Sequence, residues 1–484
     1  MKIKKGRRRW VKRALWSLLL IVLYMVVGMM APFIKRKPVS AEYKKNFNIQ
    51  KFYGSKTSVD RAAIVETGTD ALDERIRMLN QAEERIILST FDMREGESTK
   101  DVLSVILNAA QRGVKVQIMV DGISGLIRME GEPVFYAVSS HPNIEIRLYN
   151  KPNPLMPWTI HGRMHDKYII VDDKFYIMGG RNSFDYFLGD YIEDNKSLDR
   201  EVLIYNTAHG QEASKESSLG ELEAYFYSVW NLKYCKPFHN DERLMERKSV
   251  QAEIHALQER YELLQSERPE LFAVDDHYEE TTVPIKKATL ISNPTDIYGK
   301  EPTAWYQIQQ LMENAKERVV LHTPYAVMDT PMYEGFKTLS GKGIDFKMVI
   351  NSVENGDNIV ASSDYLKYKS KIIQTGVELY EYDGGISSHG KSLLIDDNIS
   401  IVGSFNFDLR STYVDTELML AIDSEALNKD LEAKMDVFQK DCRKVIDEKN
   451  YEVPEHVTVA EVPTWKRIIW AVLGVVLQPF RVLV

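Results

Sequence analysis

Two copies of one pattern place a histidine, a lysine and an asparagine at fixed spacing in this chain. In residues 165–182, HDKYIIVDDKFYIMGGRN, the histidine is followed by a lysine at +2, an aspartate at +7, a glycine at +14 and an asparagine at +17, and residues 389–406, HGKSLLIDDNISIVGSFN, repeat the plan. The matching residues all lie 224 positions apart: His165 and His389, Lys167 and Lys391, Asp172 and Asp396, Gly179 and Gly403, Asn182 and Asn406. An imidazole, an ammonium and an amide together suit the binding and transfer of a phosphate group.

Each copy predicts a β-hairpin that carries these side chains to one end of a sheet. Tyr168–Val171 and Ser392–Ile395 are short apolar runs typical of buried strands, and Phe175–Met178 and Ile399–Val402 are expected to be the returning strands. Side chains alternate across a strand, so a histidine and a lysine two residues apart point to the same side. The glycines that follow allow a tight turn and a close approach of the backbone to a ligand.

The segments around the hairpins alternate between strand and helix signals. In the first half the expected elements are helices at 70–82, 99–112 and 219–230 and strands at 84–91, 114–121 and 144–149. The second half repeats this order, because ERVVLHT at 317–323 matches ERIILST at 84–90 and GIDFKMVIN at 343–351 matches GVKVQIMVD at 113–121. The fold class is therefore expected to be α/β, with two homologous halves related by a pseudo-twofold axis.

An acidic segment follows the hairpin in both halves. Asp415-Thr416-Glu417-Leu418 echoes Asp199-Arg200-Glu201-Val202. Asn182 and Glu201 lie 19 positions apart, whereas Asn406 and Glu417 lie 11 apart, so the first copy has eight extra residues in this alignment. The alignment pairs Glu201 with Glu417.

Composition divides the chain into five segments. We expect a basic N-terminus and transmembrane anchor at 1–45, a first half at 46–238, a charged helical linker at 239–285, a second half at 286–450 and a tail at 451–484. Residues 249–266 of the linker have helical spacing with a polar majority, typical of a solvated helix, although a lid or a membrane contact is an alternative. The tail contains an uncharged run, 468–477, that is too short to span a bilayer. Its tryptophan and basic flanks favour a segment that lies in the membrane interface, and a helix packed on the domain is the alternative.

The N-terminus predicts a single membrane anchor. Eight of the first thirteen residues are basic, and Ala14–Ile34 then runs 21 residues without a charge, long enough to cross a hydrocarbon core of about 30 Å. A cleaved signal peptide is the rival interpretation, because Val39-Ser40-Ala41 resembles a cleavage site. Lys35-Arg36-Lys37 intervenes before that site, which favours an uncleaved anchor. Eight basic residues precede the span and five follow it, so the positive-inside rule places the body of the protein outside the cytoplasm.

Charge and cysteine content exclude several classes. The chain carries a net charge of −8 and its first thirteen residues carry +8, so the remainder is −16. An acidic body is a poor general binder of nucleic acid, whose affinity depends on lysine and arginine. The two cysteines, Cys235 and Cys442, exclude a disulfide framework and a cysteine-rich metal site, and their pairing is left open.

The doubled HxKxxxxD followed by GGRN or GSFN resembles the phospholipase D superfamily, and more narrowly the bacterial cardiolipin synthases of the phospholipase D type. HPNIEIRLYN before the first copy, HGRMHDK leading into it, GGRNSFDYF after it and SFNFDLRST in the second copy carry the narrower likeness. The likeness covers roughly residues 60 to 450. One departure is that members of this family often begin with two membrane spans, whereas this sequence shows one full span.

The resemblance implies a double displacement that needs no metal or cofactor. One imidazole attacks phosphorus and forms a phosphohistidine, while the other protonates the leaving alcohol and then deprotonates the acceptor. By analogy His165 is the nucleophile and His389 the acid and base. The motif residues Asp172 and Asp396 are counted with the catalytic set, although we expect them to support the strand and turn geometry. The remaining roles are phosphate binding by Lys167, Asn182, Lys391 and Asn406, and orientation of the histidines by Glu201 and Glu417.

Three functions remain open at this point. The leading hypothesis is a membrane-anchored phosphatidyltransferase that joins two phospholipids into cardiolipin, with phosphatidylglycerol, or also phosphatidylethanolamine, as substrate. The second is a hydrolytic phospholipase D or a metal-independent phosphodiesterase or nuclease. The third is a non-catalytic lipid-binding protein that has kept the fold. The expected partners are phospholipids and the membrane, and no nucleic acid.

Overall fold

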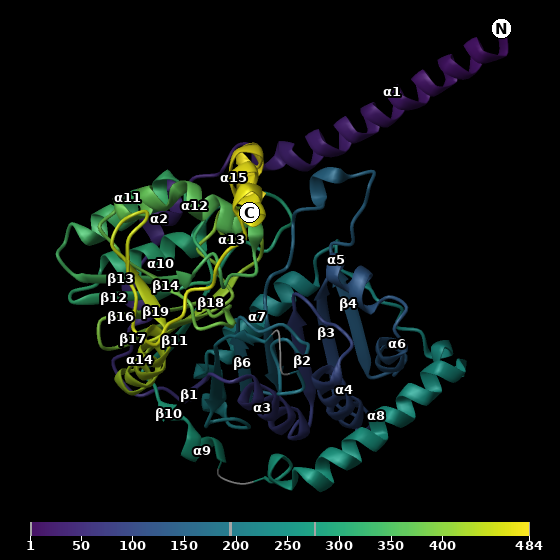
Figure 1. Ribbon diagram of the computed structural model, residues 1–484. Helices are drawn as coiled ribbons and strands as arrows, with labels where there is room; N and C mark the ends of the chain where they lie inside the picture. The colour runs from purple at the N-terminus through teal and green to yellow at the C-terminus, as the bar shows by residue number, and fades with distance from the viewer. Residues whose placement is uncertain (1, 193–195, 275–276, 484) are drawn as a thin grey trace.

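Two nine-stranded mixed sheets form the two halves of the chain, which lie side by side (Figure 1). The computed structural model describes residues 2–192, 196–274 and 277–483. In spatial order the first sheet consists of β10 (Val283–Pro284), β1 (Asp60–Val65), β8 (Glu201–Asn206), β6 (Phe175–Gly179), β5 (Tyr168–Val171), β2 (Arg85–Thr90), β3 (Lys115–Asp121), β4 (Ile144–Tyr149) and β9 (Lys236–Pro237). The second consists of β11 (Lys287–Ser292), β18 (Leu418–Asp423), β17 (Ile399–Gly403), β16 (Ser392–Ile395), β12 (Arg318–His322), β13 (Asp345–Asn351), β14 (Glu378–Tyr382), β19 (Cys442–Val445) and β20 (Tyr451–Glu452).

The two sheets have the same topology. From β1 to β9 and from β11 to β19 the strands follow one another in the same spatial and chain order, with parallel pairing between β2, β3 and β4 and between β12, β13 and β14. The remaining neighbours pair antiparallel. This repetition confirms the prediction of two homologous α/β halves.

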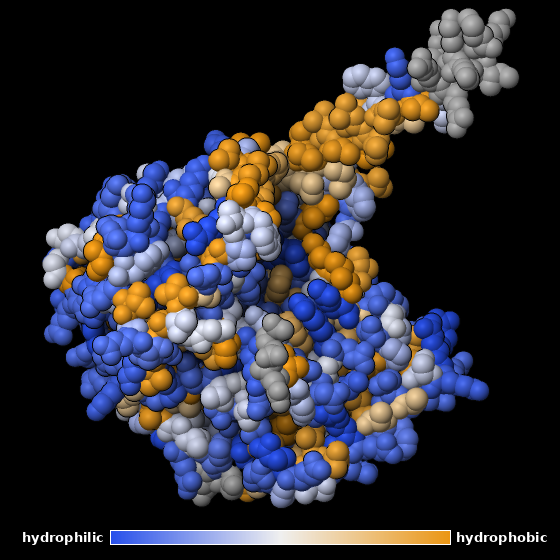
Figure 2. Space-filling model, viewed as in Figure 1, coloured by the Kyte–Doolittle hydropathy of each residue, from blue (hydrophilic) through white to orange (hydrophobic). Residues whose placement is uncertain are grey.

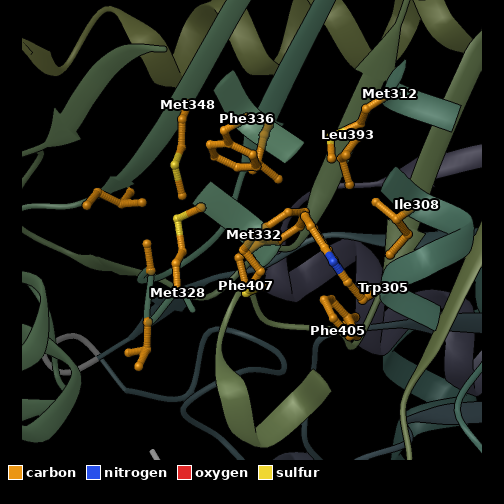
Figure 3. Packing of buried hydrophobic residues seen from close by; sticks show 14 of the residues in the cluster. Trp305, Ile308, Met312, Met328, Met332, Phe336, Met348, Leu393, Phe405 and Phe407 are labelled. Atoms are coloured by element: carbon orange, nitrogen blue, oxygen red, sulfur yellow. The ribbon is translucent and has the colours of Figure 1, made fainter. Parts of the chain in front are cut away.

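Helices cover the outer face of each sheet. The first sheet packs against α3 (Gly68–Asn80), α4 (Glu97–Gln111) and α6 (Pro133–Ser139), and α8 (Lys248–Glu267) lies across α4 and α6 with Val250 and Leu257 buried. The second sheet packs against α10 (Thr303–Glu313), α11 (Thr330–Ser340) and α12 (Ile359–Ile373). Figure 3 shows part of this second core, in which Trp305 and Phe336 from the helices and Leu393 from the sheet belong to one buried cluster.

The inner faces of both sheets share a third core. Its members come from β5, β6 and β8 of the first half and from β16, β17 and β18 of the second, together with α7 (Leu219–Trp230) and α14 (Glu425–Gln439). Phe226 on α7 and Leu431 on α14 are fully buried in this layer. The molecule is therefore layered as helices, sheet, two central helices, sheet and helices, and separating the halves would expose the central apolar layer to water.

Two short reciprocal β-bridges join the halves at the residues that directly precede His165 and His389. Met164 pairs with Thr416 in a parallel bridge, and Ser388 of β15 (Ser387–Ser388) pairs with Leu198 of β7 (Ser197–Leu198) in another. Met164 and Ser388 occupy the same place in the two copies, as do Leu198 and Thr416. A contact in which i meets j and j meets i is the signature of a twofold axis, so the register supports the pseudo-twofold arrangement.

The two hairpins form where the sequence predicts them. Tyr168–Val171 and Ser392–Ile395 are strands, each followed by an aspartate with positive φ, 52° at Asp172 and 50° at Asp396. Asp172 accepts hydrogen bonds from the backbone amides of residues 83–85, and Asp396 accepts them from residues 316–318. Each aspartate thus clamps the chain that enters β2 or β12, at the end of the strand away from its histidine. Their place in the catalytic set is corrected to a structural one, in line with the expected turn role.

One helix is long and apolar enough to cross a membrane among the residues described. Helix α1 (Lys2–Met30) continues through η1 (Ala31–Phe33). The segment Trp10–Phe33 has a mean hydropathy of 2.3, and no residue in its most apolar stretch is buried. The helix projects away from both halves (Figure 1), and the part between its basic end and the body has a mainly apolar surface (Figure 2). An exposed apolar helix of this length fits a hydrocarbon environment.

The clamp at Asp396 should contribute measurably to stability. Asp396→Ala removes three charge-assisted hydrogen bonds to backbone amides and places alanine at a positive φ, so we expect a loss of about 2–4 kcal/mol in the free energy of unfolding. Denaturant unfolding of the full chain in detergent would measure it.

Asp397→Ala is the matched control, because that exposed neighbour forms a surface ion pair with Arg318 and such pairs contribute about 0–1 kcal/mol. Equal destabilisation by the two variants would contradict the clamp.

Candidate active site

His165 lies three residues before the first residue of β5 and is held by the other half of the chain. Its backbone amide donates to the carbonyl of Thr416 at 3.3 Å, and its Nδ1 lies 2.9 Å from Oε1 of Glu417. The edge of its ring meets Phe91 with the centroids 4.9 Å apart. The ring is therefore fixed by one hydrogen bond from the second half and one aromatic contact from the first.

His389 has the reciprocal arrangement. Its backbone amide donates to the carbonyl of Leu198 at 2.6 Å, and its Nδ1 lies 2.7 Å from Oδ2 of Asp199. The ring of Phe187, from the first half, packs against the His389 ring with the centroids 5.2 Å apart. Each imidazole is thus oriented by a carboxyl group of the opposite half, so neither half holds a complete site alone.

These contacts select a tautomer for the neutral rings. An ionised carboxylate only accepts hydrogen bonds, so Nδ1 of each ring carries a proton when the acid beside it, Asp199 or Glu417, is ionised. Nε2 is then left with a lone pair. A ring in this state can act as a nucleophile or as a base through Nε2.

Two buried lysines lie beside the imidazoles. Nζ of Lys167 donates to the carbonyl oxygen of His165 at 2.5 Å, and Nζ of Lys391 donates to the carbonyl of His389 and lies 3.0 Å from Nε2 of its ring. Burial lowers the pKa of Lys167 to about 7 and that of Lys391 to about 8, with neighbouring carboxylates opposing the shift. An anionic ligand would restore the favourable surroundings that these ammonium groups lack.

Burial and the positive charges of both halves lower the pKa values of the two imidazoles. Burial lowers the pKa of His165 well below its ordinary value, and the charges of Lys167, Lys391 and His389 act in the same direction. Burial and then Lys391 lower the pKa of His389, against the raising effect of Asp199. The groups of the two halves therefore form one electrostatic unit rather than two separate sites.

The two asparagines of the motif are buried and incompletely paired. Oδ1 of Asn182 and Oδ1 of Asn406 have no hydrogen-bond partner within the described parts of the chain. Nδ2 of Asn406 reaches the hydroxyl of Tyr325 at 3.3 Å, and its backbone amide donates to Ser411, whose hydroxyl donates to Glu417. Unpaired buried amide groups are uncommon in folded proteins and suit a ligand-binding position.

The alignment that paired Glu201 with Glu417 is wrong. Gly179 of β6 lies opposite Glu201 in β8, whereas the equivalent Gly403 of β17 lies opposite Met419 in β18. In this register Glu417 corresponds to Asp199, so the first copy has six extra residues rather than eight.

Glu201 does not orient a histidine and instead serves the outer core. Its carboxylate forms a buried bidentate ion pair with Arg75 of α3, at 2.6 and 2.8 Å. Asp199 stands at the joint between β7 and β8, where the chain crosses from the inter-half ladder to the first sheet, and this position directs its carboxylate to His389.

The residue after the motif glycine matches the acid beside it. A Cβ on Gly180 would lie 2.3 Å from Oδ1 of Asp199, so the backbone must approach the carboxylate closely there. The equivalent Ser404 instead donates its hydroxyl to Oε2 of Glu417 at 2.5 Å, and Ser411 donates to Oε1 at 2.6 Å. GGRN and GSFN therefore differ because one accompanies an aspartate and the other a glutamate.

The acids behind the two rings have opposite electrostatic settings. Burial raises the pKa of Glu417 well above its ordinary value, although Lys167 and the two serine hydroxyls oppose this. Burial would also raise the pKa of Asp199, but His389, Lys391 and Arg181 outweigh it and hold that pKa below its ordinary value. The imidazoles are thus equivalent in topology and different in environment.

Several polar residues near the site were not singled out by the sequence. Arg163 pairs with Asp121 at 2.6 Å, and Arg410 pairs with Asp415 at 2.9 Å. Arg410 also donates to the carbonyl of His161, the histidine outside the motif, whose pKa burial lowers to about 4. Their signal in the sequence is weak, because isolated arginine and aspartate residues are common on surfaces.

Two further observations concern metal ligands and thiols. Within residues 2–192, 196–274 and 277–483, no group of three or more histidine, cysteine, aspartate or glutamate side chains is arranged to hold a metal ion. Cys235 and Cys442 are both buried and unpaired, which answers the question that the sequence left open.

The corrected register can be tested without an activity assay. Asp199→Asn removes the anion that raises the pKa of His389, so the pKa of this ring should fall further, and NMR titration of histidine-labelled protein in detergent would follow it.

Glu201→Gln is the matched variant. It should leave the titration of His389 unchanged while lowering stability, because it leaves Arg75 buried without its partner. A shift of the His389 pKa by Glu201→Gln and not by Asp199→Asn would restore the original alignment.

Comparison with known proteins identifies relatives over most of the chain. The family model described as cardiolipin synthase, PLD-like domain matches residues 75–188 and 308–438, just over half of the sequence. Cardiolipin synthase C of Escherichia coli K12 is 27% identical over 407 residues, covering 75% of this chain and 81% of that protein. Minor cardiolipin synthase ClsB of Bacillus subtilis 168 is 20% identical over 436 residues, covering 87% and 89%.

Two further comparisons agree with the fold. An uncharacterized protein of Helicobacter pylori 26695 is 27% identical over 403 residues, covering 76% of this chain and 77% of that protein. The crystal structure of phosphatidylserine synthase from Haemophilus influenzae Rd KW20 superposes with a TM-score of 0.57 at 15% identity, covering 81% of this chain and 89% of that one. With its doubled motif and matching halves, the chain belongs to the phospholipase D-like family described by the cardiolipin synthase domain model.

Proposed function

We propose that the protein is a membrane-anchored phosphatidyltransferase that makes cardiolipin from two phospholipids through a phosphohistidine intermediate. The observation that carries the proposal is the pair of imidazoles, each bonded through Nδ1 to an acid of the other half and each next to a buried lysine. Membership of a family of phospholipid synthases supports the reaction class. Phosphatidylglycerol is the proposed substrate, and phosphatidylethanolamine is the alternative donor.

The first half-reaction would use His165 as nucleophile. Its Nε2 lone pair attacks the phosphorus of phosphatidylglycerol and the bond from phosphorus to the head-group oxygen breaks. His389 enters this step as an imidazolium and gives its Nε2 proton to the departing glycerol. Lys167, Lys391, Asn182 and Asn406 would hold the phosphoryl oxygens while negative charge shifts among them. Glu417, in its ionised form, would stabilise the positive charge that develops on His165.

The second half-reaction reverses these roles. His389 takes the proton of a head-group hydroxyl on a second phosphatidylglycerol, whose oxygen attacks phosphorus as the bond to His165 Nε2 breaks. The atoms balance as two phosphatidylglycerol molecules giving one cardiolipin and one glycerol. A water molecule in place of the second lipid would give phosphatidic acid, so exclusion of water from the buried site favours transfer.

The anchor supports a membrane location. The apolar helix Trp10–Phe33 fits a single span, and a body next to the bilayer would meet substrates that are themselves membrane lipids. The distribution of basic residues favours an extracytoplasmic body.

Two alternatives remain distinguishable by product. A hydrolase would release phosphatidic acid from the same lipids, and a nuclease would cleave DNA in the presence of EDTA. A non-catalytic lipid-binding protein would give no product, and the intact motifs in both halves disfavour it.

Mass spectrometry of lipids after incubation of the purified full chain with phosphatidylglycerol vesicles tests the proposal. We expect cardiolipin and glycerol in equal amounts, and a decrease of at least about 1,000-fold in His165→Ala, because covalent transfer is then impossible.

His255→Ala is the control, since this exposed histidine on α8 lies outside the site. Phosphatidic acid as the main product would replace the transferase by a hydrolase, and full turnover by His165→Ala would refute the assigned nucleophile.

The lysines predict an alkaline limit on substrate capture. Because the pKa of Lys167 is lowered to about 7 and that of Lys391 to about 8, the free site loses positive charge as the pH rises through this range, and kcat/KM should fall. A bound phosphodiester raises both pKa values, so kcat should persist to higher pH. Kinetics with short-chain phosphatidylglycerol between about pH 5 and pH 10 would show this separation, and a flat kcat/KM across the range would contradict it.

A further inference from the structure

The C-terminal helix α15 (Thr464–Val476) presents its apolar side outward. Trp465, Ile468, Val472 and Val475 recur at helical spacing and are 52–67% exposed, and Ile469 and Val476 lie on the same side. A helix on a soluble domain normally turns such a stripe toward the core and its polar residues toward water. In α15 the outward stripe carries no acid, and Lys466 and Arg467 stand at its beginning.

Short contacts hold the opposite side of α15 on α12. Trp470 is buried there, and a Cβ on Gly474 would meet the carbonyl of Ser363 at 3.2 Å. Lys367 of α12 donates to the carbonyl of Gly474 at 2.9 Å, and Tyr368 donates to Gln478 at 2.5 Å. The helix is therefore docked in a fixed orientation, and the exposure of its apolar stripe is a built feature of the fold.

Helix α15 lies near the base of the apolar N-terminal helix (Figure 1), and apolar surface is seen in the same area of Figure 2. Arg410 donates to the carbonyl of Leu483, in the turn after α15, and to the carbonyl of His161. The ring of His161 meets Phe33 at the end of the anchor, with the centroids 5.9 Å apart. Arg410 thus links the C-terminal segment, the loop before His165 and the end of the anchor.

The loop of residues 151–160 completes the junction with the anchor. A Cβ on Gly28 would lie 2.4 Å from Cγ of Pro157, and the hydroxyl of Tyr24 donates to the carbonyl of Leu155 at 2.8 Å. The side chain of Leu155 is 79% exposed at the tip of this loop. In the view of Figure 2, apolar surface lies next to the place where α1 leaves the body.

We propose that the stripe of α15 and Leu155 form a docking face for the lipid bilayer that α1 enters, with the stripe buried among acyl chains. This rests on the membrane anchor of the proposed function and adds the face that meets the lipid. The bilayer is the expected partner because the stripe lies close to the end of α1, the helix that enters the bilayer. Lys35 and Lys37 follow the end of α1, and Arg467 stands at the beginning of α15. All three are exposed and would complement anionic head groups.

The consequence is an orientation of the active site. The loop that contacts the anchor leads into His165. Arg410 donates to the carbonyl of His161 in this segment, and its positive charge adds to the effect of burial in lowering the pKa of His165. A body held at the bilayer by α1 alone could swing about the anchor, whereas a second contact through α15 would hold the site next to the head groups.

Depth-dependent fluorescence quenching tests the contact. The full chain carrying Val472→Cys, labelled with an environment-sensitive fluorophore, is placed in vesicles of phosphatidylglycerol and phosphatidylcholine that contain doxyl-labelled lipid. The native cysteines are buried, so the new thiol is the accessible one among the described residues. We expect strong quenching at position 472 and little at Val437→Cys, an exposed apolar position on α14.

Absence of quenching at 472 overturns the proposal. So does a disulfide between the 472 positions of two copies in vesicles, because it would assign the stripe to a second copy of the chain.

A paired activity measurement separates this inference from the proposed reaction. Ile468→Asp with Val472→Asp should lower turnover of long-chain phosphatidylglycerol in vesicles by roughly tenfold, since charges oppose burial of the stripe in lipid. Turnover of a water-soluble short-chain analogue should be unchanged, and Val437→Asp should affect neither. Undiminished turnover of vesicle lipid by the double variant overturns the docking face, whereas a wild-type chain that converts neither substrate but is quenched at 472 overturns only the reaction.

Discussion

The structure depends on one reciprocal interaction: each half provides the carboxyl group that orients the catalytic imidazole of the other half. Nδ1 of His165 bonds to Glu417 and Nδ1 of His389 bonds to Asp199, and each bond crosses the interface. A buried imidazole without a partner would be costly, so the halves must dock before either ring has its orientation. The apolar layer between the sheets supplies the driving force for docking, and the two reciprocal bridges fix the register at which it occurs.

The symmetry of the fold does not extend to the chemistry of the site. Glu417 is surrounded by serine hydroxyls, whereas the backbone of Gly180 lies against Asp199. The pKa of Glu417 is raised by burial, while that of Asp199 is lowered by His389 and the nearby cations despite burial. Two imidazoles that perform different steps need such unequal surroundings, and small differences after the motif glycine provide them.

The sequence revealed the parts of the site whose spacing is fixed by local geometry. The hairpin strands, and the positions of His165 and Lys167 just before the first of them, could be predicted, because this spacing is local and repeats in both copies. The role of Asp199 could not, because the insertion after Asn182 shifts the register, and the likeness of DREV to DTEL suggested a wrong alignment. Pairing of Gly179 with Glu201 and of Gly403 with Met419 is a property of the folded sheet. The hydrogen bond from each histidine to an acid of the other half depends on how the two halves dock, and strand and helix patterns do not predict docking.

The central claim is that both imidazoles act on one phosphorus across the interface, and trapping the covalent intermediate tests it most directly. His389→Ala removes the base needed for the second step, and a phosphatidyl ester of nitrophenol needs no protonation to leave. Tandem mass spectrometry of this variant after reaction should locate a phosphatidyl adduct on His165, formed more slowly when Glu417→Gln is added. An adduct on another residue, or none despite release of nitrophenol, would contradict the account.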